Sequence, residues 1–377
     1  MRTLALAVAM LGVATVAVAQ TADQAAPPTA PRVRGFTGDP RDWESWFDHG
    51  VRVLRVAPRE AAAAFAWSAR LDPTRAEPHF AFYAATMLVL PRERTVQYFR
   101  GDAEAMGDPR VLAADSARTL GLMRNPLVHR GLEAVMFDAL PGSFRDDRDT
   151  RAWIAYSNGE LLQAVRLHTR TIDRLGERAR WQLFDRALAY AASGDSRAAL
   201  QDLRRLHEAL KTDEESASVT FYRSKHFLLQ MIGTLQLRNS DVTGAQASFA
   251  EALVEDASFA YAHAGLAQVA RAQQRFGDAV EALNLAIELN DRDAVFYHAR
   301  GASQLSLSNF AEALADFRRA AELQPLWPAP VLAQAMVLER QRQDEGARTL
   351  YLRYLEMAPA SDPQARSIRQ RLGVGAP

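Results

Sequence analysis

Large apolar residues recur in this chain at intervals of 34 residues. Four of them fall in one column of the pattern, and they are Phe249, Leu283, Phe317 and Tyr351. Small residues keep the same interval, and so do Pro325 and Pro359. A fixed period of this length indicates stacked structural repeats. The chain has 377 residues, and a stack of repeats reaches such a length by contacts between neighbours instead of around several separate cores.

Within one period, the apolar residues lie three or four positions apart, as Phe310, Ala313, Leu314 and Phe317 do. This spacing places them on one helix face that must be buried against a neighbour. Gly301 is small where two backbones approach each other. A proline such as Pro325 cannot continue a helix, so it fixes the turn into the next repeat. The sequence therefore predicts paired helices, each pair covered by the next.

The order of small, small, large apolar and proline residues resembles the tetratricopeptide repeat family, in an exported bacterial form. The resemblance implies an all-α solenoid of stacked antiparallel helical hairpins wound into a right-handed superhelix. Four regular repeats are expected over residues 223–359, followed by a capping helix and tail over 360–377. In the last repeat Tyr354 takes the place of the usual small residue, which predicts looser packing there.

The remaining chain is expected to divide into segments that follow the pattern less strictly. Residues 36–90 contain family-like helices, beginning with Trp46 and Gly50, and residues 146–222 contain divergent repeats around Ala164 and Ala199. A polar stretch at 211–216 reads as an inserted loop. Residues 91–145 are either an irregular helical insertion or a pair of degenerate hairpins.

The first residues have the pattern of a secretory signal. Arg2 precedes an apolar run that ends in Ala17-Val18-Ala19, so residues 1–19 are expected to be removed and the mature chain to begin at Gln20. The alternative is an uncleaved anchor, but the run is shorter than the ~20 apolar residues that span a bilayer. Proline-rich residues 20–35 are an expected flexible tether. The expected location is periplasmic or secreted, with no transmembrane segment after cleavage.

Composition and motifs argue against several classes of function. The net charge is zero and the pI is about 7.1, so no basic surface for nucleic acid is expected. Leu210 and Ser224 precede the two lysines, which rules out a phosphate-binding Gly-Lys loop. There is no cysteine, and the eight histidines have no ligand spacing. We therefore expect no enzyme activity, no catalytic residues, no metal and no cofactor.

The resemblance also implies which residues face the inside of the superhelix. Carried over position by position, the partner-binding concave face is expected to consist of Gln230, Thr234, Tyr261, Ala264, Gln268, Arg271, His298, Ala302, Leu305, Leu332 and Met336. These positions lack the Lys and Asn with which some members grip an acidic C-terminus, so that ligand is disfavoured. The opposing interpretation is that these side chains merely pack against a neighbouring hairpin.

Two functions remain open at this point. The first is a non-catalytic scaffold that binds a protein or peptide segment through its concave face. The alternative is a repeat array that presents a specialised ligand-binding or catalytic segment in residues 92–145. The oligomeric state is not predicted.

Overall fold

The computed structural model describes residues 29–99, 102–125, 148–211 and 224–374. Every regular element within these ranges is helical, and no strand occurs in them. Consecutive helices pack side by side as antiparallel pairs. The predicted all-α array of stacked hairpins is therefore confirmed.

The N-terminal block comprises six helices. They are α1 (Trp43–Val53), α2 (Pro58–Leu71), α3 (Glu77–Val89), α4 (Arg92–Phe99), α5 (Ala103–Met106) and α6 (Pro109–Arg124). Prolines in the first turn of α2, α3 and α6 suit helix starts, where their missing N–H costs no hydrogen bond. The sequence shows no partner for α3 at the expected distance after Pro91. The structure supplies one further along the chain, because α6 packs against α3 and the short helices α4 and α5 lie between them in sequence.

Two hairpins follow in the middle of the chain. They consist of α9 (Arg148–Ser157), α10 (Leu161–Leu175), the short 3₁₀ helix η1 (Gly176–Ala179), α11 (Arg180–Ala192) and α12 (Ser196–Lys211). Residues 126–145 of the expected insertion or degenerate hairpins, and residues 212–216 of the expected loop, lie outside the described residues. Lys211, the first residue of that loop, is the last residue of α12. These hairpins and α13 share one apolar core, to which α3 and α6 of the N-terminal block also contribute.

The regular repeats are four hairpins closed by a last helix. They are α13 (Lys225–Arg238), α14 (Val242–Glu255), α15 (Ala260–Ala272), α16 (Phe276–Leu289), α17 (Ala294–Ser306), α18 (Phe310–Leu323), α19 (Pro328–Arg340), α20 (Asp344–Met357) and α21 (Pro363–Leu372). Gly301 on α17 faces the Phe317 ring on α18. A Cβ built on Gly301 would lie 2.8 Å from that ring, so the glycine is what lets the two helices pack this closely.

The turn inside each of these hairpins has one geometry. The residue that precedes the N-cap of the second helix has a left-handed backbone. The N-cap residue donates its amide to the carbonyl five residues earlier, as Asp241 N does to Gln236 O at 2.8 Å. This is the Schellman end of a helix. The left-handed residues are Gly159 and Gly194 in the middle hairpins and Ser240, Gln274, Ser308 and Arg342 in the regular repeats.

Tyr354 does not loosen the last repeat, so that prediction was wrong. Its side chain is buried, and its hydroxyl donates to Asp362 Oδ2 at 2.6 Å. Asp362 also caps α21 by accepting from the amides of Gln364 and Ala365. The large side chain therefore ties the last hairpin to the terminal helix through the cap.

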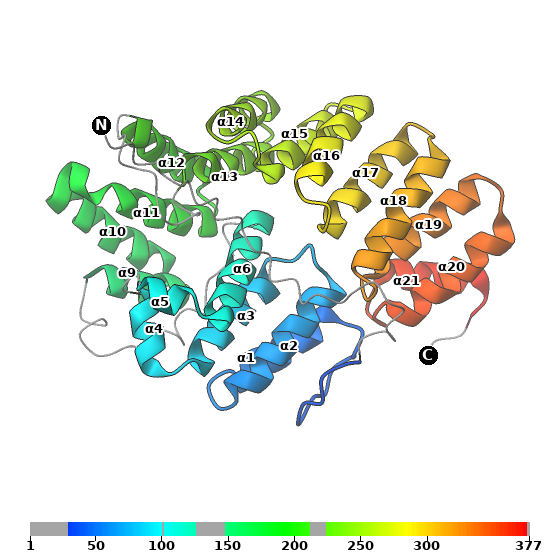
Figure 1. The fold of residues 1–377 in the computed structure, drawn as a ribbon, viewed down its shortest axis with the longest axis horizontal. Helices are drawn as coiled ribbons and strands as arrows, with labels where there is room; N and C mark the ends of the chain where they lie inside the picture. Colours follow the sequence, from blue (N-terminus) through cyan, green and yellow to red (C-terminus); the bar gives the residue numbers. More distant parts are fainter. Residues whose placement is uncertain (1–28, 100–101, 126–147, 212–223, 375–377) are drawn as a thin grey trace, which may run out of the picture.

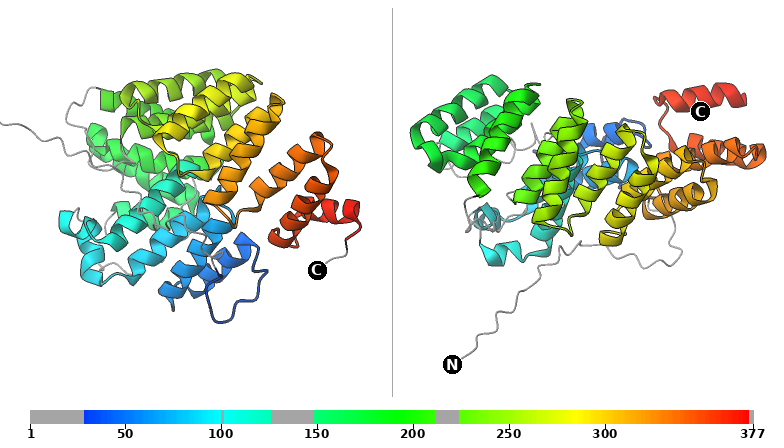
Figure 2. Two further views of the ribbon diagram at one scale, coloured as in Figure 1. Left: turned by 45° about the vertical axis from the view of Figure 1, so that its right-hand side comes forward. Right: turned by 90° about the horizontal axis from the view of Figure 1, so that it is seen from above.

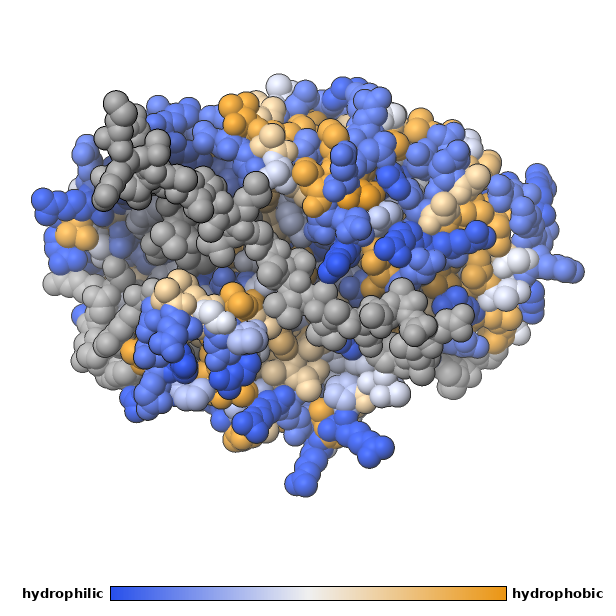
Figure 3. Space-filling model, in the orientation of Figure 1, coloured by the Kyte–Doolittle hydropathy of each residue, from blue (hydrophilic) through white to orange (hydrophobic). Residues whose placement is uncertain are grey.

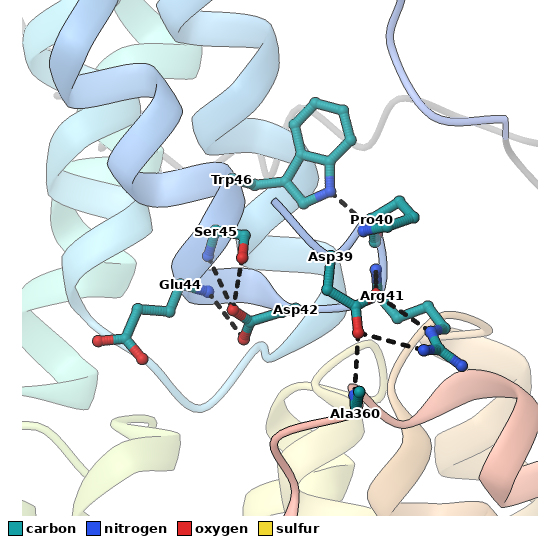
Figure 4. Close-up of polar contacts among 8 residues, drawn as sticks. All are labelled: Asp39, Pro40, Arg41, Asp42, Glu44, Ser45, Trp46 and Ala360. Atoms are coloured by element: carbon teal, nitrogen blue, oxygen red, sulfur yellow. Dashed lines mark hydrogen bonds and ion pairs between the residues drawn. The ribbon is translucent and has the colours of Figure 1, made fainter. Parts of the chain in front are cut away.

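The two ends of the array meet. Figures 1 and 2 show α1 and α2 lying beside the C-terminal helices, so the helices follow one another around a closed circuit. Asp39 Oδ2 accepts a hydrogen bond from the Ala360 amide at 2.9 Å (Figure 4). Leu326, in the turn before α19, packs against the apolar cluster that contains Trp46 and Trp67. We call the contacts between the N-terminal block and the regular repeats the seam.

Candidate functional site

A partly open cavity of about 580 Å³ lies between the regular repeats and the N-terminal block. Its wall includes the first helices of successive hairpins, α13, α15 and α17. Eight of the eleven predicted concave-face residues line it, namely Gln230, Thr234, Tyr261, Ala264, Gln268, Arg271, His298 and Ala302. We call this space the inner cavity.

The other three predicted residues lie outside the inner cavity. Leu305 packs with Phe317 in the core of its own hairpin. Leu332 is buried in the core of the last hairpin. Met336 is 42% exposed and does not line the cavity. The predicted residues on α13, α15 and the first part of α17 therefore share one cavity, whereas the three that lie further along the array do not line it.

The opposite wall comes from the N-terminal block, which the sequence could not place there. Asp72 and Thr74, in the turn between α2 and α3, and Met123 and Arg124, at the end of α6, face the regular repeats across the cavity. Trp327, before α19, completes the lining. The repeat register could have identified Trp327, because it stands one period after Asp293. No local signal marks Arg124, whose partner is far away in sequence.

Arg124 forms a buried ion pair across the seam. Its Nη2 donates to both carboxylate oxygens of Asp293, at 2.6 and 2.7 Å, and the side chains are 10% and 5% exposed. Tyr261 donates its hydroxyl to Asp293 at 3.2 Å, and burial together with the nearby carboxylate raises the pKa of Tyr261. Asp293 also caps α17 by accepting from the Val295 amide. One carboxylate thus joins three helices.

His79 lies next to this ion pair. Burial, together with the positive charge of Arg124, lowers the pKa of His79 to about 4. Its imidazole is therefore neutral near pH 7. A proton added there would place a second positive charge beside Arg124 in a buried site, which is unfavourable. The seam accordingly carries a group that titrates only under acidic conditions.

His298 and Trp327 form an aromatic wall inside the cavity. Their ring centroids are 4.8 Å apart, and His298 is also 5.4 Å from the Phe317 ring. Burial, and then the charge of Arg271, lowers the pKa of His298 to about 4. The two rings are tilted by 47° to each other, and the wall is uncharged at neutral pH.

The outer surface and the remaining described residues add few specific features. The face in Figure 3 mixes hydrophilic and hydrophobic residues, with hydrophobic areas over the C-terminal repeats. Within the described ranges, no group of His, Asp and Glu side chains has the arrangement of a metal site. None of the described helices combines the length and apolar character needed to cross a membrane. The inner cavity is thus the best-defined candidate site.

The regular repeats have a constant interval, which allows them to be compared with known proteins. The four regular repeats keep the 34-residue interval in their packing columns and in the left-handed residues of their turns. The described part of the chain is an all-α helical-repeat structure whose hairpins resemble tetratricopeptide repeats. No protein-family model matches the sequence, and no curated protein matches it either.

Three of the solved structures that match this chain have a limited similarity to it. A crystal structure of MamA is 19% identical and covers 45% of this chain and 93% of its own, with a TM-score of 0.40. The C-terminal part of a TPR repeat-containing protein from Cytophaga hutchinsonii is 15% identical over 55% of this chain and 78% of its own, with a TM-score of 0.46. In the APC/C hetero-tetramer Cut9-Hcn1, the matching chain is 13% identical over 90% of this chain and 57% of its own, with a TM-score of 0.44.

Proposed function

We propose that this chain is an exported, non-catalytic scaffold that binds a segment of a protein partner in the inner cavity. The observation that carries the proposal is the gathering of eight inward-facing repeat residues around one space. Repeat arrays of paired helices present such inner surfaces to extended or helical segments. The lining combines amide, hydroxyl, aromatic and small side chains, which suits recognition of a polypeptide.

The alternative of a ligand-binding segment in residues 92–145 gains one specific observation. Met123 and Arg124, at the end of α6, line the same cavity as the repeat residues. Both hypotheses therefore lead to one site, whose two walls come from the repeats and from the N-terminal block.

Filling the cavity tests its role directly. Peptides selected from a random display library on the full chain should bind wild type and fail to bind Gln268→Trp, because Gln268 is an exposed side chain on the cavity wall. Val254→Trp is the matched control, since Val254 is 85% exposed on α14 and lies outside the lining. Equal binding of the selected peptides to both variants, with unchanged circular dichroism, would exclude the cavity as the binding site.

Export can be tested on the N-terminus. The signal pattern in residues 1–19 supports cleavage after Ala19. Mass spectrometry of the protein expressed in a bacterium should find Gln20 as the first residue in the envelope fraction. An intact residue 1–19 segment on the folded protein would contradict a cleaved signal.

A further inference from the structure

The charged side chains that line the inner cavity differ in whether they have a hydrogen-bonding or ionic partner. Arg124 is neutralised by Asp293. The Asp72 carboxylate accepts from Thr74 and from Arg75 Nε, the latter at 3.1 Å. The guanidinium of Arg271, in the last turn of α15, has neither a hydrogen bond nor an ion pair with any other described side chain. The lining therefore carries one uncompensated positive charge.

The surroundings of Arg271 are suited to a planar apolar group. Its charge contributes to the lowered pKa of His298, which places the guanidinium within electrostatic reach of the aromatic wall. His298 and Trp327 form that wall. Gln268, one turn before Arg271 on α15, adds an amide to the same lining. A cation beside an uncharged aromatic surface is complementary to an anion attached to an aromatic ring.

The size of the cavity limits the ligand. Its volume of about 580 Å³ falls within the range of ~300–1,000 Å³ that is usual for small-molecule sites. This space holds one ring system with its substituents. A long folded element would require the seam to open.

We propose that the inner cavity binds an aromatic carboxylate, with the carboxylate on Arg271 and the ring against His298 and Trp327. The ligand is a free small molecule of this class, so the inner cavity takes a second kind of occupant besides the partner segment. The proposal rests on the inner cavity being the binding site, and it adds the chemistry that the site selects.

Calorimetric titration of the full chain with three probes tests the selection. Naphthalene-2-carboxylate should bind, and 2-naphthamide, which has the same ring without the charge, should bind at least tenfold more weakly. Acetate, which has the charge without the ring, should also bind at least tenfold more weakly. Equal affinity for the carboxylate and the amide would overturn the proposal.

A pair of arginine variants separates the site from general surface charge. Arg271→Gln should remove the preference for naphthalene-2-carboxylate over 2-naphthamide. Arg275→Gln should retain it, because Arg275 pairs with Asp278 at the start of α16 and does not line the cavity. An unchanged preference in Arg271→Gln would place the carboxylate elsewhere. If wild type binds none of the probes, the ligand class is wrong, whereas the peptide test with Gln268→Trp still decides whether the cavity is the partner site.

Discussion

The regular repeats and the seam are held together by different kinds of contact. Inside a regular repeat, apolar side chains close the space between helices that are adjacent in sequence, as Phe317 does beside Gly301. Across the seam, several of the defining contacts are polar and join residues more than a hundred positions apart, as in Arg124–Asp293 and Asp39–Ala360. Repeat packing is therefore local and redundant, whereas the closure of the circuit depends on a few specific groups.

Breaking the central ion pair should give the largest effect. Asp293→Asn leaves Arg124 buried without its counter-charge, and removing one partner of a buried pair costs about 3–5 kcal/mol. We expect the seam to open, so amide hydrogen exchange should accelerate in α3 and α6 while the regular repeats stay protected.

The matched control for this experiment is Asp316→Asn. Arg300 and Asp316 form a comparable pair, at 2.6 Å, but within one hairpin. This variant should destabilise α17 and α18 and leave exchange in α6 unchanged. If both variants give the same exchange pattern, the seam is not a separate structural unit.

Overpacking a regular repeat should give the next largest effect. Gly301→Leu places side-chain atoms where a Cβ alone would lie 2.8 Å from the Phe317 ring, and we expect a loss of about 3 kcal/mol in the free energy of unfolding. Gly277→Leu is the control, since a Cβ there meets nothing within 4 Å. Urea denaturation measures both. A Gly301→Leu protein as stable as wild type would remove this glycine from the close contact.

Acid should weaken the seam through His79. The folded pKa is lowered to about 4 from an unfolded value near ~6.5, so between these values the unfolded chain binds more protons than the folded one. The contribution of neutral His79 to the free energy of unfolding is fully present above pH ~6.5. It falls as the pH drops toward 4, and the loss at pH 5 is about 1–2 kcal/mol.

A variant isolates this contribution. His79→Asn should show a smaller loss of unfolding free energy between pH 7 and pH 5 than wild type, by about 1–2 kcal/mol. His263→Asn, at a position on α15 outside the cavity lining, should lose as much as wild type. An identical pH dependence in His79→Asn and wild type would show that His79 does not titrate in this range.

The smallest effect concerns the turns. Gln274 has a left-handed backbone, with φ of 60°, a conformation that costs a residue with a side chain ~1–2 kcal/mol. Gln274→Gly should stabilise the protein by a few tenths to about 1 kcal/mol, after the greater freedom of glycine in the unfolded chain is subtracted. Gly194→Ser, in the equivalent turn of a middle hairpin, should destabilise the protein. Melting temperatures test both, and a destabilised Gln274→Gly would contradict the assigned turn geometry.

The sequence was most informative where contacts are local. The 34-residue columns identified the regular hairpins, because a repeated sequence places equivalent side chains in equivalent surroundings. The resemblance to a known repeat family supplied the inward-facing positions, eight of which line the inner cavity. The columns gave no indication that the turn residues Ser240 and Ser308 are left-handed, since neither is the glycine that usually marks such a position. The prediction for Tyr354 was wrong because its partner, Asp362, is the N-cap residue of the next helix and lies outside the repeat pattern.

The sequence by itself determined the kind of architecture, since periodic apolar residues specify helices and helices of this spacing must stack on their neighbours. Only the tertiary structure decided that the array closes on itself and that Arg124, Met123 and Asp72 form the second wall of the cavity. The physical reason is that stacking depends on side chains one repeat apart, which periodicity reveals. Closure depends on small rotations summed over the whole array and on single pairs such as Arg124 and Asp293, which leave no periodic trace.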